Sequence, residues 1–175
     1  MEHILAIAAS ANQLSIAVMI NGEVVAGRRH LSVYSHATGV VPLSIETIAD
    51  AGTTFDAMTH VAVGCGPGSF TGIRVAVAAA KGFCMAHHAK AVGVSGMQAL
   101  AHAAIHAAPS MTAPCLVLAD TRRGSLYAQI FDATARPLGT IFETTIQKLP
   151  HLIDYETVGS DLHVIGTDRK VVANT

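Results

Sequence analysis

The densest group of residues that could do chemistry is a glycine-rich segment, Gly64-Cys-Gly-Pro-Gly-Ser-Phe-Thr-Gly-Ile-Arg74. Glycines let a backbone approach a ligand closely, and the free amides at a helix start attract anions. The spacing fits neither a Walker loop nor a dinucleotide fingerprint. A tight strand-to-helix turn without a ligand and a phosphate or nucleotide site are therefore equally supported. The candidate ligand residues are Gly66, Gly68, Ser69, Thr71 and Gly72.

Carboxylates, which enzymes use as acids, bases and magnesium ligands, are absent from the middle of the chain. No Asp or Glu occurs between Asp56 and Asp120. This segment can supply neither a carboxylate general acid or base nor a carboxylate ligand for Mg²⁺. We therefore expect no catalytic residues.

Ten histidines raise the question of a metal site. His102 and His106 are four residues apart, so on a helix they share a face, as zinc-binding pairs do. No third ligand is evident beside them. An exposed polar stripe is favoured, and we expect no metal.

Arg122 and Arg123 follow Asp120 at the end of an apolar run. A solvated hairpin tip is favoured slightly. The alternative is that the two arginines contact an anion or a partner.

Composition limits the class of protein. The 175 residues are 51% hydrophobic and 13% charged, which excludes disorder. The apolar runs are shorter than the ~20 residues of a membrane-spanning helix, and Glu2 stands where a signal peptide would be basic. Three cysteines without a CxxC pair are typical of a reduced compartment, so we expect a cytoplasmic protein. A net charge of -1 argues against independent nucleic-acid binding.

The first part of the chain should form three strands and then alternating helices and strands. Asn21-Gly22 between two apolar runs predicts a hairpin. A helix is expected over about 36–51, with Val41, Ile45 and Ile48 facing the core and Gly52 ending it. A strand over 59–65, a helix over 71–88, a strand at 92–94 and a helix over 96–107 follow. This order is typical of a ribonuclease H-like lobe with a mixed sheet.

A second, partial set of strands follows Pro109 and Pro114. Strands are expected over 115–119, 125–131, 139–145 and 162–165, with a short segment near 147–153. The chain should therefore consist of two related lobes, at 1–108 and 109–175.

These segments together resemble the bacterial TsaB (YeaZ) family of the TsaD/Gcp-like superfamily. The resemblance covers about residues 3–132 and rests on four motifs: Ile4-Leu-Ala-Ile7; Ser35-His36 with Pro42; the segment from Gly66 to Arg74 with Ala80-Lys81-Gly82; and Asp120-x-Arg122-Arg123-Gly124 with Tyr127. It implies an α/β, actin-like ATPase (ASKHA) fold. Two ribonuclease H-like lobes with mixed sheets are expected, the second of them reduced.

The resemblance also implies a role. Such a chain would be a non-catalytic scaffold or activating subunit for the TsaD-like catalytic subunit that makes threonylcarbamoyladenosine in tRNA next to the anticodon. A TsaE-like ATPase would assist, and a homodimer could form when the chain is alone. It would reach tRNA only through the complex and would have no cofactor of its own, because ATP and metal belong to the partner subunits.

Two observations, drawn from the resemblance, argue against catalysis. Ala8 stands where the family usually has an acid on its first strand. Gly96 and Leu100 occupy the approximate positions of the paired metal-binding histidines in TsaD-like relatives. The alternatives are a nucleotide- or phosphate-binding module and a glycopeptidase-like enzyme of the same fold.

The partner surface is expected on the helices that begin at His36 and Thr71. Both carry apolar residues on more than one face, and a helix apolar nearly all round must be covered on both sides. The alternative is that loops or the second lobe cover this surface. The expected contact residues are His36, Val40, Leu43, Thr47, Arg74, Val75, Ala78 and Ala79.

Overall fold

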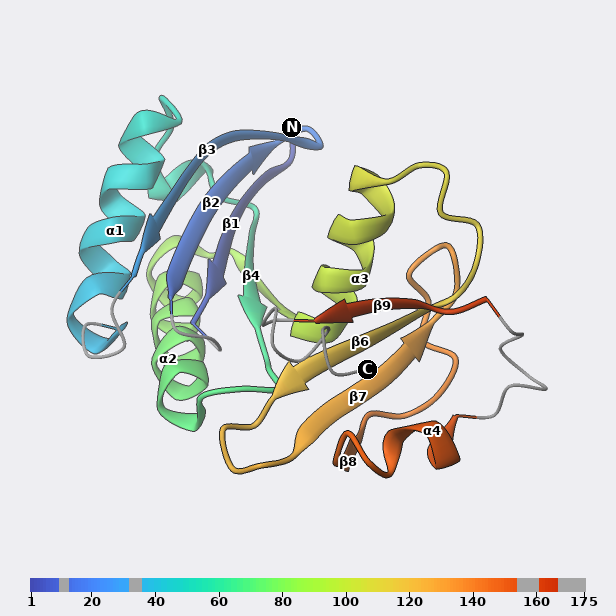
Figure 1. Ribbon diagram of the computed structural model, residues 1–175. Coiled ribbons are helices and arrows are strands. Elements are labelled where there is room, and N and C mark those ends of the chain that lie inside the picture. Colours follow the sequence, from blue (N-terminus) through green and yellow to red (C-terminus); the bar gives the residue numbers. More distant parts are fainter. Residues whose placement is uncertain (10–12, 32–35, 154–160, 167–175) are drawn as a thin grey trace. The chain divides into compact units, whose positions relative to one another are not determined.

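The computed structural model describes residues 1–9, 13–31, 36–153 and 161–166. The chain forms two compact units, Met1–Ser95 and Gly96–Thr175, coloured blue to green and green to red in Figure 1. The division lies before helix α3 (Gly96–Ala107), whereas the sequence suggested a boundary after it. The reason is packing: Met97 and Ala101 of α3 are buried in the core of the second unit.

The first unit contains a five-stranded mixed sheet. Its strands are β1 (His3–Ala8), β2 (Leu14–Ile20), β3 (Glu23–His30), β4 (His60–Gly64) and β5 (Lys90–Val94), in the order β3-β2-β1-β4-β5. The first three strands are antiparallel, and β4 and β5 run parallel to β1 and to each other. The predicted hairpin is confirmed, because Asn21 and Gly22 both have positive φ, at 51° and 88°.

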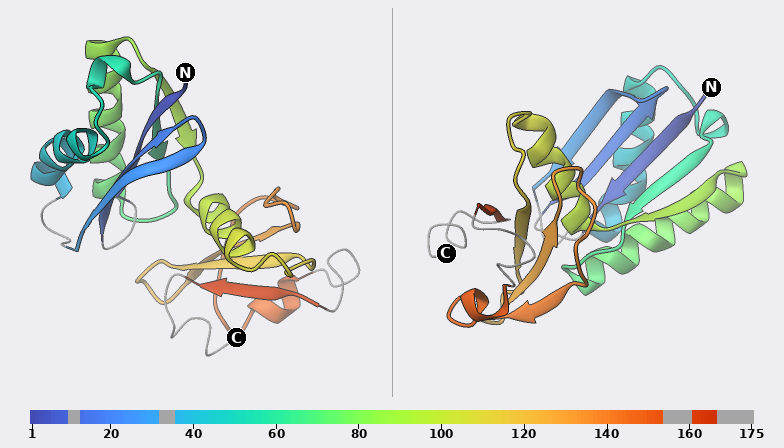
Figure 2. Two further views of the ribbon diagram at one scale, coloured as in Figure 1. Left: turned by 90° about the horizontal axis from the view of Figure 1, so that it is seen from above. Right: turned by 90° about the vertical axis from the view of Figure 1, so that its right-hand side faces the viewer.

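Two long helices lie side by side on one face of this sheet: α1 (His36–Asp50) and α2 (Phe70–His87) (Figures 1 and 2). A short 3-10 helix, η1 (Phe55–Ala57), precedes β4. Alternate strand residues point toward the helices, as the two-residue period of a strand requires. The strands contribute Leu5, Ile7, Ile16, Val18 and Val61 to this core, and the helices contribute Val40, Ile48, Ala76 and Ala80.

The face of α1 that packs on the sheet differs from the predicted face. Val41 and Ile45 are 46% and 53% exposed, so the prediction that they face the core was wrong. Val40 is buried instead, together with two hydroxyl residues, Ser44 and Thr47. Ser44 Oγ donates to the Val40 carbonyl at 2.7 Å, and Thr47 Oγ1 donates to the Leu43 carbonyl at 2.6 Å. Because each hydroxyl bonds to its own helix, burial leaves neither of these two hydroxyls unsatisfied.

The second unit repeats the strand order of the first. Its strands are β6 (Cys115–Asp120), β7 (Leu126–Phe131), β8 (Phe142–Thr144) and β9 (His163–Gly166), in the order β8-β7-β6-β9. Here too one strand, β9, runs parallel to the central strand, while β7 and β8 are antiparallel. The described residues thus repeat β3-β2-β1-β4, which confirms two related lobes with mixed sheets.

Strand β6 is buried on both sides. Cys115, Val117 and Ala119 lie in the same cluster as Met97 and Ala101 of α3. Leu116 and Leu118 belong to a second cluster, which includes Leu149 of the short helix α4 (Leu149–Leu152). A strand covered on both faces is expected to be a continuous apolar run, as Cys115–Ala119 is.

Candidate functional site

The neighbouring helices α1 and α2 expose large apolar side chains. On α1 these are Val41 and Ile45. On α2 they are Phe70, at 73% exposed, and Met85, at 82%. We call these four residues, together with the exposed Arg74 and Ala78 of α2, the helix-pair face. Apolar side chains this exposed on neighbouring helices are typical of an interaction surface.

Arg74 gives this face a positive charge held in a defined place. Its guanidinium carbon lies 5.3 Å from the centre of the Phe70 ring, one helical turn earlier. A guanidinium over a ring face is attracted by the negative π surface. Ala78, one turn after Arg74, is small, so another helix could approach the backbone of α2 closely here.

The structure divides the eight predicted contact residues into three groups. Arg74 and Ala78 are exposed. Leu43, Val75 and Ala79 are partly buried and pack against the core of the first unit. Val40 and Thr47 are buried completely, so they are not available to a partner. His36 begins α1, but its side chain lies outside the described part of the structure.

Sequence reasoning missed four exposed residues: Val41, Ile45, Phe70 and Met85. The error on α1 arose because the buried stripe contains Ser44 and Thr47, which a hydrophobicity pattern assigns to the surface. The only signal was the spacing of Val40, Ser44, Thr47 and Ile48, which places them on one helical face.

Helix α1 is anchored to β3 by a charged group. Arg28 Nε donates to Asp50 Oδ2 at 2.6 Å, and its Nη2 donates to Oδ1 at 3.1 Å. Arg28 Nη1 also donates to Glu46 Oε2 at 2.5 Å. The hydrogen bonds from Arg28 lower the pKa of Asp50 and raise that of Arg28 itself. Two adjoining turns of α1 are thereby fixed to the sheet edge.

Helix α2 is fixed at both ends. Ser69 caps its start, with Oγ accepting from the Gly72 amide at 3.2 Å. Near its end, His87 Nδ1 lies 2.6 Å from Asp56 Oδ1, and the His87 ring stacks on Phe55 with centroids 5.1 Å apart. These contacts fix the two ends of α2, and therefore the positions of its exposed residues.

The glycine-rich segment forms the turn from β4 into α2. Gly66 has φ +95°, and a Cβ there would lie 2.8 Å from Ile73 Cδ1. Gly68 has φ +150°. Ser69, Thr71 and Gly72 form the first turn of the helix, and the Gly72 amide is already used by the cap. The turn geometry accounts for the glycines, and the phosphate site stays a prediction.

Arg122 and Arg123 lie at the β6–β7 hairpin tip in the second unit. Arg122 has φ +60°, and its amide donates to Asp120 Oδ1 at 2.7 Å. The Arg123 amide donates to Thr121 Oγ1 at 3.2 Å. Both side chains are exposed, as a solvated hairpin tip requires, and an anion or partner contact stays a prediction.

Three positions that bear on catalysis lie on β1 and α3. Ala8 ends β1 without an acid, Gly96 begins α3, and Leu100 packs on the second unit's core. Among the described residues, no three His, Cys, Asp or Glu side chains come together as a metal site. In the same part of the chain, no helix has the length and apolar character needed to cross a membrane.

The fold defines the class to which this chain belongs. Two mixed sheets of the same strand order, with helices against each, form the actin-like ATPase architecture. Two YeaZ structures from Pseudomonas aeruginosa, one described as an uncharacterized protein with similarity to peptidase YEAZ, align over 100% of this chain and 80% of theirs. Their TM-scores are 0.86 and 0.84, at 22% identity, which shows a shared fold.

The sequence comparison gives the family. The profile of TsaD, tRNA N6-adenosine threonylcarbamoyltransferase, matches residues 30–162, and the chain belongs to this family. The tRNA threonylcarbamoyladenosine biosynthesis protein TsaB of Haemophilus influenzae is 30% identical over 129 residues, which are 71% of this chain and 51% of that protein. TsaB of Escherichia coli is 29% identical over 124 residues, 71% of this chain and 52% of its own. The chain thus spans about half the length of these relatives.

Proposed function

We propose that this chain is a non-catalytic scaffold subunit that binds and activates a TsaD-type enzyme in threonylcarbamoyladenosine biosynthesis. The observation that carries the proposal is the helix-pair face, with Val41, Ile45, Phe70 and Met85 exposed to water. The similarity to TsaB, whose name gives the same pathway, supports the choice of partner.

The energetics support association through this face. Complete burial of one large apolar side chain contributes about 1.5–3 kcal/mol. The four side chains are 46–82% exposed, so their further burial contributes about 4–8 kcal/mol in total. This lies within the range of about 4–15 kcal/mol that bringing two proteins together costs. Two helices that meet two helices of a partner form a four-helix contact, a common way to cover such faces. A related catalytic subunit is the proposed partner, and a second copy occupies the face when that subunit is absent.

The chemistry is assigned to the partners. The chain has Ala8 on its first strand and no carboxylate between Asp56 and Asp120, so it lacks acids with which to organise Mg²⁺ and water there. ATP and a catalytic metal would be bound by the TsaD-like subunit and a TsaE-like ATPase. With a net charge of -1, the chain would meet tRNA only within the complex.

The test removes the apolar character of the face without disturbing the core. Ile45→Glu combined with Ala78→Glu introduces charge on both helices at exposed positions. We expect a circular dichroism spectrum like that of the unchanged protein and loss of co-purification with the TsaD-like subunit of the same organism. Val75→Glu is avoided because Val75 packs against the core.

The matched control is Val24→Glu, which places the same charge on an apolar residue of β3 that is 69% exposed. This variant should bind the partner normally. Unchanged co-purification of the Ile45→Glu/Ala78→Glu protein, or equal loss in the Val24→Glu control, would show that the helix-pair face is not the contact.

A further inference from the structure

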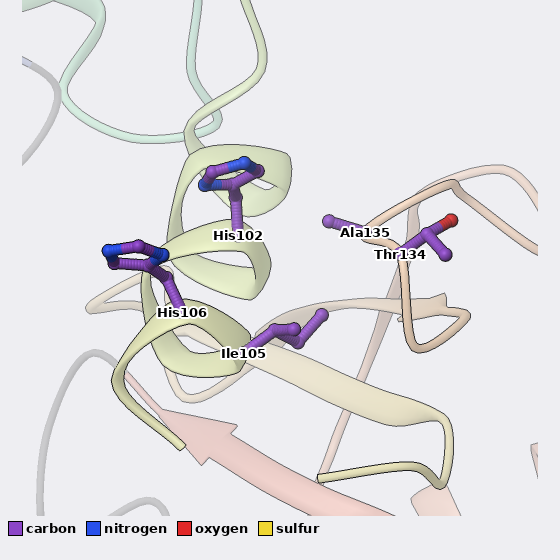
Figure 3. A pocket seen from close by; sticks show the side chains of 5 residues that line it. All are labelled: His102, Ile105, His106, Thr134 and Ala135. Carbon is purple, nitrogen blue, oxygen red and sulfur yellow. The ribbon is translucent and has the colours of Figure 1, made fainter. Parts of the chain in front are cut away.

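A pair of histidines on α3, in the second unit, lies outside the proposed partner contact. His102 and His106 project from the same side of the helix, one turn apart (Figure 3). Their ring planes differ by only 16°, and the ring centroids are 6.5 Å apart. Both side chains are exposed. Two imidazoles thus point in similar directions from a rigid element.

The ring nitrogens of this pair are available to a ligand. His3 interacts with Thr53, His60 with Thr59 and His87 with Asp56. Within the described part of the chain, neither His102 nor His106 has a hydrogen-bond partner. The imidazole nitrogen of histidine is the commonest protein ligand for transition metals.

The distance suits chelation. Imidazole nitrogens bind Zn²⁺ at about 2.0–2.1 Å, so two rings on one ion have centroids about 5–6 Å apart. The pair would reach this separation by small rotations of exposed side chains. A shallow pocket of about 180 Å³, lined by both histidines with Ile105, Thr134 and Ala135, adjoins the rings and has room for the ion's water ligands.

We propose that His102 and His106 form a two-histidine site for a divalent transition metal ion. Water would complete the coordination, because the described residues supply no third His, Cys, Asp or Glu ligand. Imidazole sites follow the order of affinity in which Cu²⁺ exceeds Ni²⁺ and Zn²⁺. The site departs from the sequence expectation of no metal.

This site differs from the catalytic metal site implied by the family resemblance. The corresponding positions are Gly96 and Leu100, six residues earlier on the same helix. Six residues turn a helix through about 240°, so the two pairs of positions face different directions. Leu100 indeed packs toward the core, whereas the two histidines are exposed. The ion would clamp adjacent turns of α3 and would not take part in group transfer.

The experiment uses untagged protein and the chlorides of Cu²⁺, Ni²⁺ and Zn²⁺ alone. Isothermal titration should show one ion per chain at this site, with Cu²⁺ bound most tightly. His102→Ala or His106→Ala should weaken the affinity at least about tenfold, since each removes half of the chelate. Each ion should raise the melting temperature of the unchanged protein, because two ligands one turn apart are brought together only in the folded helix.

A matched control keeps the number of histidines and changes only their spacing. His106→Ala combined with Ala107→His moves one ring to an exposed position five residues from His102, about 140° round the helix. This variant should bind as weakly as His106→Ala. Binding should also weaken in acid, because metal coordination requires a deprotonated imidazole nitrogen.

Three results would overturn the proposal: no binding to the unchanged protein at millimolar metal, equal affinity in His102→Ala/His106→Ala, or full affinity in the respaced control. The test of the metal site and the test of the partner contact can be told apart. The Ile45→Glu/Ala78→Glu protein should keep the metal site, and the histidine variants should keep the partner.

Discussion

Gly66 shows how one residue fixes the path of the chain into α2. Its φ of +95° is costly for any residue with a Cβ, and that Cβ would also meet Ile73 at 2.8 Å. The requirement for glycine at this position therefore follows from the turn alone. No ligand has to be invoked for it.

Gly66→Ala should lower the free energy of unfolding by about 1–3 kcal/mol, mostly through backbone strain. Urea unfolding measures the change. Gly82→Ala is the matched control, because a Cβ at Gly82 meets nothing within 4 Å and helical alanine is preferred to glycine. The control should be neutral or stabilising by up to about 1 kcal/mol. Equal stability of the two variants would show that the turn is relaxed.

At the scale of elements, α1 shows that the most hydrophobic residues of a helix are not always the buried ones. Ser44 and Thr47 are both 0% exposed, while the more hydrophobic Ile45 is half exposed. The hydroxyls can be buried because each is satisfied by the carbonyl one turn earlier. A pattern of apolar residues could not have predicted the burial of these two hydroxyl residues, because their burial depends on hydrogen bonds made within the helix.

Adjacent valines test the orientation of α1 directly. Val40→Ala should destabilise the protein by about 1–3 kcal/mol, because it opens a gap in the core. Val41→Ala, the same change at an exposed site, should alter stability by less than about 0.5 kcal/mol. Chemical denaturation of both variants provides the comparison. The reverse ranking would restore the predicted orientation.

The bond between Arg28 and Asp50 predicts a pH dependence of stability. The lowered pKa of Asp50 means that its ionised form stabilises the folded state above the pKa of the unfolded chain. This stabilisation is lost as the pH falls below about 4 and through the lowered folded pKa. Asp50→Asn should therefore be less stable than the unchanged protein at pH 7.

The difference between the two proteins should shrink as the pH approaches 3. Denaturation curves from pH 7 to pH 3 measure it, and Glu23→Gln at the exposed start of β3 is the control. A difference that stays constant over this range would mean that the charge of Asp50 contributes nothing to the anchoring of α1.

For the whole molecule, the sequence predicted the elements better than their contacts. Asn21-Gly22, Gly52 and the glycines after β4 marked turns by local chemistry, so the first unit's strand and helix order was recovered. The division between units was different, because α3 packs through Met97 and Ala101 onto strands that follow it in the sequence. The exposed apolar residues lie on the two helices that were expected to carry the partner surface, but Val41, Ile45, Phe70 and Met85 were not among the expected contact residues. The local sequence pattern indicates where a helix or strand forms, whereas tertiary packing decides which of its faces is buried.

The isolated chain should hydrolyse neither ATP nor peptides. The expectation rests on Ala8 and on the absence of carboxylates between Asp56 and Asp120. Turnover is measured with Mg²⁺ on highly purified protein, with the TsaD-like subunit assayed in parallel. Hydrolysis that co-purifies with the chain and disappears in Gly66→Ala, under conditions in which that variant is folded, would favour the nucleotide-binding alternative.

The two units share a strand order, but only the first packs two helices of 15 and 18 residues against its sheet. In the described part of the second unit, the helices are α3, with 12 residues, and α4, with four. Among the described residues, the internal duplication therefore does not repeat the helix-pair face. With one such face among the described residues, association through it would close at two subunits rather than grow into a filament. Under the proposed function, self-pairing and enzyme binding would compete for this surface, and the concentration of the catalytic subunit would set how much of the free dimer remains.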